Sequence, residues 1–204
     1  MLNTIERIER ECPDVDSAEL NYWLGIAWRN FTAWYIRGEE RRGYLEKAVS
    51  YLEKAYEIEK RFSGNRWKQY AGEWGRLLID EKIVRDLEKG ITILEELYIN
   101  ETDYEPTLYH YADGLYKKGE FEKAAEVALE LINRAAKTEL FKDGVPPGLK
   151  KIAAKVDRAL IRKYKKEGSL NKAIEISERL LENPAASERD KLNHEKLKKT
   201  LGKN

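Results

Sequence analysis

Residues 160–173 read LIRKYKKEGSLNKA, and residues 111–124 read YADGLYKKGEFEKA. The two stretches share one skeleton: a large residue followed by a smaller one, a bulky residue one helical turn later, a glycine, then an aromatic residue or leucine, and finally an alanine. On both sides of Gly119 and Gly168 the apolar residues recur at three- and four-residue steps, which is typical of amphipathic helices. Each stretch therefore predicts two helices joined by a short turn at the glycine.

Helical periodicity covers nearly all of the chain. Residues 44–58, 87–99, 120–132 and 170–181 each carry one apolar stripe with Glu and Lys on the opposite face. No stretch alternates in the way that predicts a strand, and Glu, Lys, Leu, Ala and Arg are good helix formers. The sequence predicts an all-α fold of about ten helices. The residues that separate them are Gly38, Gly43, Gly64, Gly119, Gly144, Gly168, Pro106, Pro146 and Pro147.

Two weaker copies of the skeleton begin at Leu24 and Tyr70, and Trp28 and Trp74 are their bulky residues. The four copies together resemble the tetratricopeptide repeat (TPR), whose signature pairs W-x-x-L-G-x-x-Y with a downstream alanine, bulky residue and proline. The small residue of each second helix is Ala48, Gly90, Ala124 or Ala173. These positions are 42, 34 and 49 residues apart, whereas a regular array keeps a period of ~34. The resemblance is therefore strong in the last two copies and degenerate in the first two.

The resemblance implies one TPR-like domain over residues 1–204, an α-solenoid of about four antiparallel helix pairs. The repeat-like units span about 18–60, 64–100, 105–137 and 149–184, followed by a C-terminal cap at 185–204. Leu2–Glu11 is the expected N-terminal cap. A single pair cannot bury both of its apolar faces, so the pairs must stack side by side.

Composition restricts the class of protein. The 204 residues hold 38 Lys and Arg against 37 Asp and Glu, so a globally polyanionic or polycationic chain is excluded. Five Trp and twelve Tyr argue against intrinsic disorder. No apolar run approaches a membrane span, and the first residues lack the apolar core of a signal peptide. Cys12 is the single cysteine, which favours a reducing cytoplasm, and abundant Glu and Lys favour a thermophile source.

Residues with catalytic chemistry are scarce. His110 and His194 lie far apart and neither has the spacing of a zinc motif. We interpret His110 as a residue of the groove wall and His194 as part of a solvated face. Cys12 has no histidine nearby in sequence, which predicts an inert thiol. The sequence therefore predicts no enzymatic activity, no metal site and no cofactor.

The TPR resemblance implies where a partner would bind. In TPR-like arrays the first helix of each pair lines the concave face, where peptides usually lie. The residues that this places on the face are Tyr22, Arg29, Asn30, Lys68, Arg76, Tyr109, Asp113, Tyr116, Lys117, Lys155, Arg158, Arg162 and Lys165. Some family members clamp a terminal carboxylate with Lys and Asn. Tyr22 and Ile26 stand at the matching places here, so that clamp is not expected.

Residues 149–166 contain eight Lys or Arg and one Asp. The helically spaced cations Lys151, Lys155, Arg158, Arg162 and Lys165 form a basic stripe. This stripe has two interpretations. It can be a site for carboxylates or phosphates. It can instead be a solvated face that pairs with acids of the preceding helix, namely Glu120, Glu122, Glu126 and Glu130.

All five tryptophans precede residue 75. Trp28 and Trp74 occupy repeat positions, which predicts that they pack in the core. Trp23, Trp34 and Trp67 do not match the repeat, and an exposed one would suit a peptide anchor or self-association.

These patterns predict a non-catalytic protein–protein interaction scaffold that binds a partner peptide or acidic segment on its concave face. The alternative is a nucleic-acid-binding helical repeat protein that uses the 149–166 stripe. An enzyme regulator or a helical enzyme is a third, weaker hypothesis, because a fold alone does not fix function.

Overall fold

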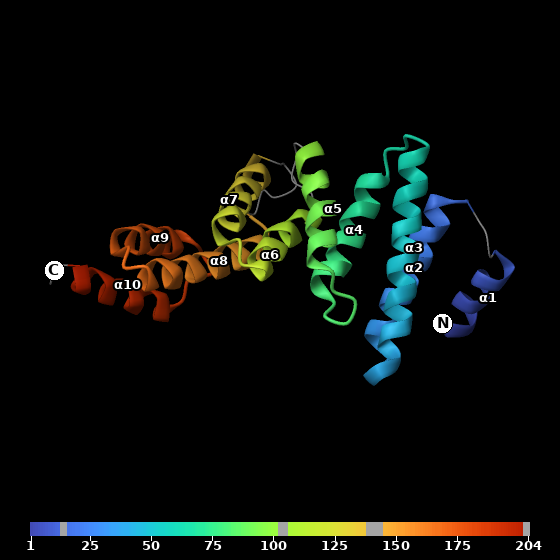
Figure 1. Ribbon diagram of the computed structural model, residues 1–204, viewed down its shortest axis with the longest axis horizontal. Helices are drawn as coiled ribbons and strands as arrows, with labels where there is room; N and C mark the ends of the chain where they lie inside the picture. The colour runs from blue at the N-terminus through green and yellow to red at the C-terminus, as the bar shows by residue number, and fades with distance from the viewer. Residues whose placement is uncertain (13–15, 102–105, 138–144, 202–204) are drawn as a thin grey trace. The chain divides into compact units, whose positions relative to one another are not determined.

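The computed structural model describes residues 1–12, 16–101, 106–137 and 145–201, which are helical with short connections and contain no strand (Figure 1). The α-helices of the described residues are α1 (Leu2–Glu11), α2 (Ala18–Tyr35), α3 (Arg41–Arg61), α4 (Trp67–Asp80), α5 (Leu87–Asn100), α6 (Tyr109–Lys118), α7 (Phe121–Lys137), α8 (Pro147–Lys166), α9 (Leu170–Glu182) and α10 (Glu188–Leu201). Two short 3₁₀ helices, η1 (Gly38–Glu40) and η2 (Pro106–Leu108), precede α3 and α6. The all-α prediction is confirmed.

The helices pack in consecutive pairs: α2 with α3, α4 with α5, α6 with α7, and α8 with α9. Contacts divide the chain into two compact units, Met1–Asn100 and Glu101–Asn204. The single TPR-like domain and its repeat boundaries stay predictions. Residue 105, at which the third repeat is expected to begin, lies outside the described residues, as do residues 202–204 of the cap.

Close helix packing in the N-terminal unit depends on glycine. A Cβ on Gly25 of α2 would lie 2.7 Å from Cγ of Leu52 of α3. In the next pair, a Cβ on Gly75 of α4 would lie 2.6 Å from Cγ of Leu94 of α5. Real Cβ atoms do not approach so closely, so these two positions allow the helices of each pair to come together.

The two matching sequence stretches of the C-terminal unit form the same turn. Gly119 and Gly168 adopt left-handed backbone conformations, with φ of 93° and 75°. After each glycine an amide reaches back over the end of the helix: Glu120 N donates to the Leu115 carbonyl at 2.9 Å, and Ser169 N donates to the Tyr164 carbonyl at 2.8 Å. The predicted helix–turn–helix at both glycines is confirmed.

Other predicted breaks have different outcomes. Gly38 begins η1 with a φ of 72°, and Gly64 lies in the turn before α4. Gly43, however, is the third residue of α3, so its prediction as a break is wrong. Helix α3 begins two residues before Gly43, at Arg41, and a Cβ at Gly43 would face open space. Gly144 lies outside the described residues.

The tryptophans behave as predicted. Trp28 and Trp74 are 0% and 4% exposed and belong to the core of the N-terminal unit, whereas Trp23 and Trp34 are exposed and Trp67 is half-buried. Each packed indole lies near a lysine: Lys47 Nζ is 4.4 Å from the Trp28 ring centroid, and Lys89 Nζ is 4.8 Å from that of Trp74. The repeat positions thus identified the packed tryptophans.

Helix α10 packs through a different face from the predicted one. Leu192 and Leu201 are exposed, while Asp190, His194 and Leu197 are buried. The interpretation of His194 as a solvated residue is therefore wrong. Apolar periodicity alone missed this face, because two of its three members are polar residues whose partners lie on α8 and α9.

Candidate functional site

In the N-terminal unit, the predicted partner-binding residues of α2 and α4 meet around Glu73. Arg29 Nη1 pairs with the Glu73 carboxylate, and Arg76 Nη2 lies 2.8 Å from it. Arg29 also donates to Oδ1 of Asn30. Tyr22 is buried. Two arginines predicted to face a partner are thus occupied by one acid of their own unit.

The tyrosine of this set is also engaged. The Tyr22 hydroxyl accepts a hydrogen bond from Gln69 Nε2 at 3.0 Å, and its ring centroid lies 4.8 Å from that of Tyr70. Burial raises the pKa of Tyr22, and the bond from Gln69 opposes that rise. Lys68, the remaining predicted residue of α4, is half-buried.

In the C-terminal unit, α6 and α8 meet around Asp113. Lys117 Nζ lies 2.6 Å and Lys155 Nζ 2.7 Å from its carboxylate oxygens. Burial alone would raise the pKa of Asp113, but the two ammonium groups hold it below its ordinary value. Lys155 Nζ also lies 4.2 Å from the Tyr116 ring centroid. Tyr109, at the start of α6, is half-buried with its ring 3.9 Å from that of His110.

Arg158 of the basic stripe joins α8 to α10. Its Nε and Nη2 donate to Oδ1 and Oδ2 of Asp190 at 3.1 Å and 2.8 Å. Nη2 also donates to the Ala185 carbonyl at 3.0 Å. Arg158 and Ser187 hold the pKa of Asp190 well below its ordinary value. A residue predicted to bind a partner thus has a structural role in attaching the last helix.

Next to this ion pair lies a pocket of about 370 Å³ between α8, α9 and α10. It is lined by Arg158, Ile161, Arg162, Lys165, Ser177, Leu180, Ser187, Arg189, Asp190, Asn193 and Leu197. The apolar contribution comes from Ile161, Leu180 and Leu197, one from each of the three helices. Ser177 donates to the Ile174 carbonyl, so the 2.7 Å contact with His194 Nδ1 requires that nitrogen to carry the proton.

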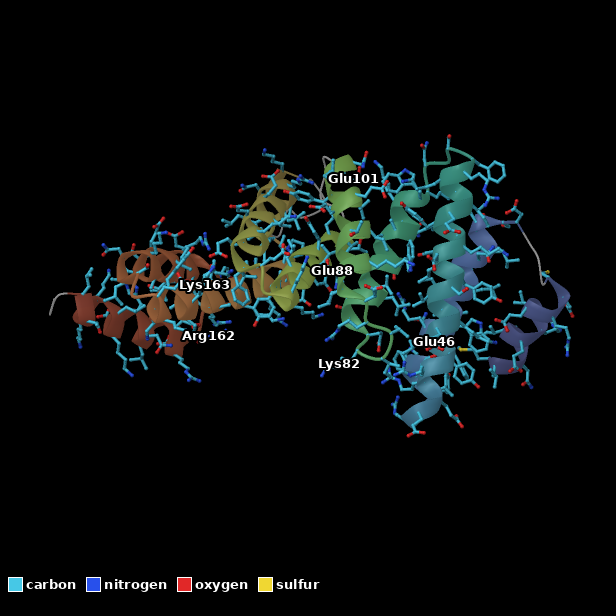
Figure 2. All side chains as sticks on the ribbon, in the orientation of Figure 1. Glu46, Lys82, Glu88, Glu101, Arg162 and Lys163 are labelled. Carbon is cyan, nitrogen blue, oxygen red and sulfur yellow. The ribbon has the colours of Figure 1, made fainter. Side chains whose placement is uncertain are left out.

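Three cations at the pocket form no ion pair with the described residues. Arg162, Lys165 and Arg189 are exposed, and the described residues include no ion-pair partner for any of them. Figure 2 labels Arg162 and Lys163 on different sides of the α8 ribbon, and Lys163 pairs with Glu122 of α7. Asp190, the one acid of the lining, is already bound to Arg158. The lining therefore has an excess of positive charge.

These contacts agree only in part with the second interpretation, in which acids of the preceding helix neutralise the basic stripe. Of the four acids expected to neutralise it, Glu122 pairs with Lys163, which lies outside the stripe, while Glu120 pairs with Lys118 and Glu130 with Arg134. Lys155 and Arg158 are instead neutralised by acids on α6 and α10. Sequence reasoning missed Asp190 and Arg189 as site residues. A Ser-x-x-Asp sequence such as Ser187–Asp190 is typical of the start of a helix, so the sequence alone gives no sign of the contact with Arg158.

A solved structure with a similar backbone identifies the architecture. A protein assigned as a kinesin light chain from Podosopora anserina, with nearly identical TPR-like repeats, superposes with a TM-score of 0.53 at 14% identity, covering 88% of this chain and 86% of that one. The fold is TPR-like. A circular tandem repeat protein with a novel repeat topology also matches, at 16% identity over 86% of this chain and 42% of the other, with a TM-score of 0.22. No family model and no curated protein sequence matches the chain.

The same kind of contact recurs within each unit. An acid on one α-helix neutralises a cation on the α-helix two places away along the chain. This holds for α2 with α4 through Glu73, for α6 with α8 through Asp113, and for α8 with α10 through Asp190. The pocket at α8–α10 differs because its remaining cations have no such acid.

The other chemical groups of the TPR-like chain are dispersed. His110 is buried beside Tyr109, and Cys12 is half-buried. Within the described ranges, no three His, Cys, Asp or Glu residues gather in a way that could hold a metal ion. No helix in those ranges is long and apolar enough to cross a membrane.

Proposed function

We propose that this protein is a non-catalytic interaction scaffold that binds an acidic segment of a protein partner at the α8–α10 pocket. The observation that carries the proposal is the group of three exposed cations, Arg162, Lys165 and Arg189, around a pocket with apolar residues from three helices. The TPR-like fold supports the scaffold class, since it commonly mediates protein–protein interaction.

Recognition would combine two kinds of contact. An apolar side chain of the partner would enter between Ile161, Leu180 and Leu197 and lose its contact with water. Carboxylates on either side of it would then reach the guanidinium groups of Arg162 and Arg189, where charge-assisted hydrogen bonds form. The predicted partner is therefore an apolar residue flanked by Asp or Glu.

The rest of the predicted binding set is engaged within the protein to different degrees. Arg29 and Arg76 share Glu73, Lys117 and Lys155 share Asp113, and Tyr22 is buried. Tyr109, Tyr116 and Lys68 keep their place in the prediction of a concave binding face. We place the primary contact at Arg162 and Lys165, because these two stripe residues are exposed and border the pocket.

The decisive experiment measures fluorescence anisotropy of labelled peptides with the full chain. One peptide carries a leucine flanked by glutamates, and its control carries the same leucine flanked by glutamines. We expect the acidic peptide to bind at least about tenfold more tightly. The variant Arg162→Glu/Lys165→Glu should lose that preference. Lys82→Glu/Arg85→Glu, which makes the same change of charge at exposed residues of the N-terminal unit, should keep it.

Three outcomes would contradict the proposal. The two peptides could bind equally, or the Arg162/Lys165 variant could bind like the native protein. A labelled single-stranded oligonucleotide could also bind more tightly than the acidic peptide, with an affinity that falls linearly with salt on a double logarithmic scale. That last result would establish the nucleic-acid alternative.

A further inference from the structure

Helix α1 lies against the N-terminal unit through one apolar face. Ile5 is 4% exposed, and Leu2 and Ile8 are partly buried against the same core. The three residues are spaced by three, which places them along one side of the helix. The opposite side carries charged residues such as Arg7 and Glu11, which pair with each other in solvent.

The carboxylate of Glu9 lies in a cage formed by Trp28 and Lys47. Trp28 Nε1 donates to Glu9 Oε1 at 2.7 Å, and Lys47 Nζ donates to Oε2 at 3.0 Å. The same carboxylate helps to raise the pKa of Tyr51. The Glu9 side chain is only 17% exposed. The Glu9 carboxylate is thus bound by specific donors on other helices of the unit.

Both donors belong to α2 and α3, and α1 supplies only the acceptor. Trp28 stacks on Tyr44 with ring centroids 5.2 Å apart, and Lys47 Nζ lies 4.4 Å from the Trp28 ring centroid. The packing of α2 against α3 therefore holds the donors in place independently of α1. The cage is a preformed receptor for one carboxylate beside an apolar strip.

Helix α1 has few features that would stabilise it as a helix by itself. Helix α1 has ten residues, its N-cap Met1 provides no side-chain hydrogen bond, and its first turn has no acidic residue. Isolated helices shorter than about 12–15 residues are marginal in water. Within α1, Ile5 is the one fully buried residue. Helix α1 is therefore helical because it is docked, and it belongs to the least stable elements of the unit.

We propose that the α2–α3 cage is a docking site for an amphipathic helix that carries one acidic residue. Helix α1 occupies this site until the helix of a partner protein displaces it. The partner repeats the pattern of Leu2, Ile5, Ile8 and Glu9, with apolar residues at i, i+3 and i+6 and an acid at i+7. A helix without that acid would leave Nε1 of the fully buried Trp28 without its acceptor, which disfavours such a helix. This site lies in the N-terminal unit and does not depend on the function proposed for the α8–α10 pocket.

The first test measures whether α1 opens in the full-length native chain. Hydrogen exchange of individual amides should be at least about tenfold faster in α1 than in α3, because α1 leaves the cage without unfolding of the α2–α3 pair. If α1 and α3 exchange at the same rate, α1 is released only by global unfolding and the proposal is wrong.

The second test supplies the helix from outside. A labelled peptide of residues 1–11 is titrated into the native chain and into the full-length variant Ile5→Asp/Glu9→Lys, whose own α1 cannot dock. The variant should bind the peptide at least about tenfold more tightly than the native chain. The same peptide with Glu9→Gln should bind the variant at least about tenfold more weakly. The matched control Asn3→Asp/Glu6→Lys, altered on the exposed side of α1, should behave like the native chain.

Circular dichroism establishes that the variant keeps its helical content. If the double variant does not fold, the single variant Glu9→Lys replaces it in the titration. A folded variant that does not bind the peptide would refute the proposal, as would equal binding of the glutamine peptide. A native chain that forms a dimer, lost in the Ile5/Glu9 variant, would identify the occupant as α1 of a second copy and would also overturn the proposed partner helix.

Discussion

Arg158 and Asp190 are joined by two hydrogen bonds, Nε to Oδ1 at 3.1 Å and Nη2 to Oδ2 at 2.8 Å, across the contact between α8 and α10. Asp190 is 7% exposed and also accepts from the Ser187 amide and hydroxyl. The pair therefore connects the start of α10 to α8.

Removal of the arginine should destabilise the protein. Arg158→Met leaves the Asp190 carboxylate buried without its cation, and we expect the free energy of unfolding to fall by about 1–3 kcal/mol. Urea denaturation followed by circular dichroism measures this loss. Arg162→Met is the matched control, because Arg162 is exposed, and it should change stability by less than about 0.5 kcal/mol. Equal effects of the two substitutions would show that the ion pair contributes nothing.

The same ion pair should make the stability of the protein depend on pH in the acid range. The pKa of Asp190 in the folded chain lies below its ordinary value of 3.8, so the folded state resists protonation more than the unfolded state does. The stabilisation is complete above the ordinary pKa and decreases as the pH falls below it. Denaturation of Asp190→Asn should therefore change less with pH in this acid range than denaturation of the native chain. Parallel pH profiles would exclude the contribution.

Tyr51 should cause the opposite dependence at alkaline pH. Burial, together with the nearby carboxylate of Glu9, raises the pKa of Tyr51 from 10.0 to about 12. The folded chain therefore retains the Tyr51 proton where the unfolded chain has lost it, so stability decreases as the pH rises from about 10 to about 12. Tyr51→Phe should weaken this decrease, and the difference between the two unfolding profiles isolates Tyr51 from the other tyrosines. Identical profiles would contradict the expectation.

Two glycines in helices should respond to alanine with opposite signs. In Gly75→Ala the new methyl group would lie 2.6 Å from Leu94 Cγ, and the resulting overpacking should cost about 1–3 kcal/mol. Gly43→Ala adds its methyl group in open space within α3, where alanine is the better helix former, and should stabilise by up to about 1 kcal/mol. Thermal melting of the two variants provides the measurement. A gain of stability in Gly75→Ala would show that α4 and α5 can separate at no cost.

The sequence predicted most of the fold because the apolar periodicity and the positive-φ glycines are local signals. Gly119 and Gly168 are the clearest examples, since both form the turn that their skeleton predicts. Gly43 misled the prediction, because a glycine signals freedom of the backbone and does not show whether that freedom is used. Contacts between helices far apart in sequence were not predictable in the same way.

The candidate site illustrates this limit. Arg162 and Lys165 were assigned to the basic stripe from their spacing, and the structure places both at a pocket. Arg158 has the same spacing but pairs with Asp190, 32 residues later in the chain. His194 is buried for the same reason: its partner Ser177 lies on another helix. The exposure of a polar side chain depends on such distant partners, which periodicity does not contain.

Helix α8 carries cations toward two other helices of the C-terminal unit: Lys155 reaches Asp113 of α6, and Arg158 reaches Asp190 of α10. Because both ion pairs begin on α8, a movement of this helix would change its contacts with α6 and α10 together. Salt screens such pairs, so it would weaken both attachments of α8 at once.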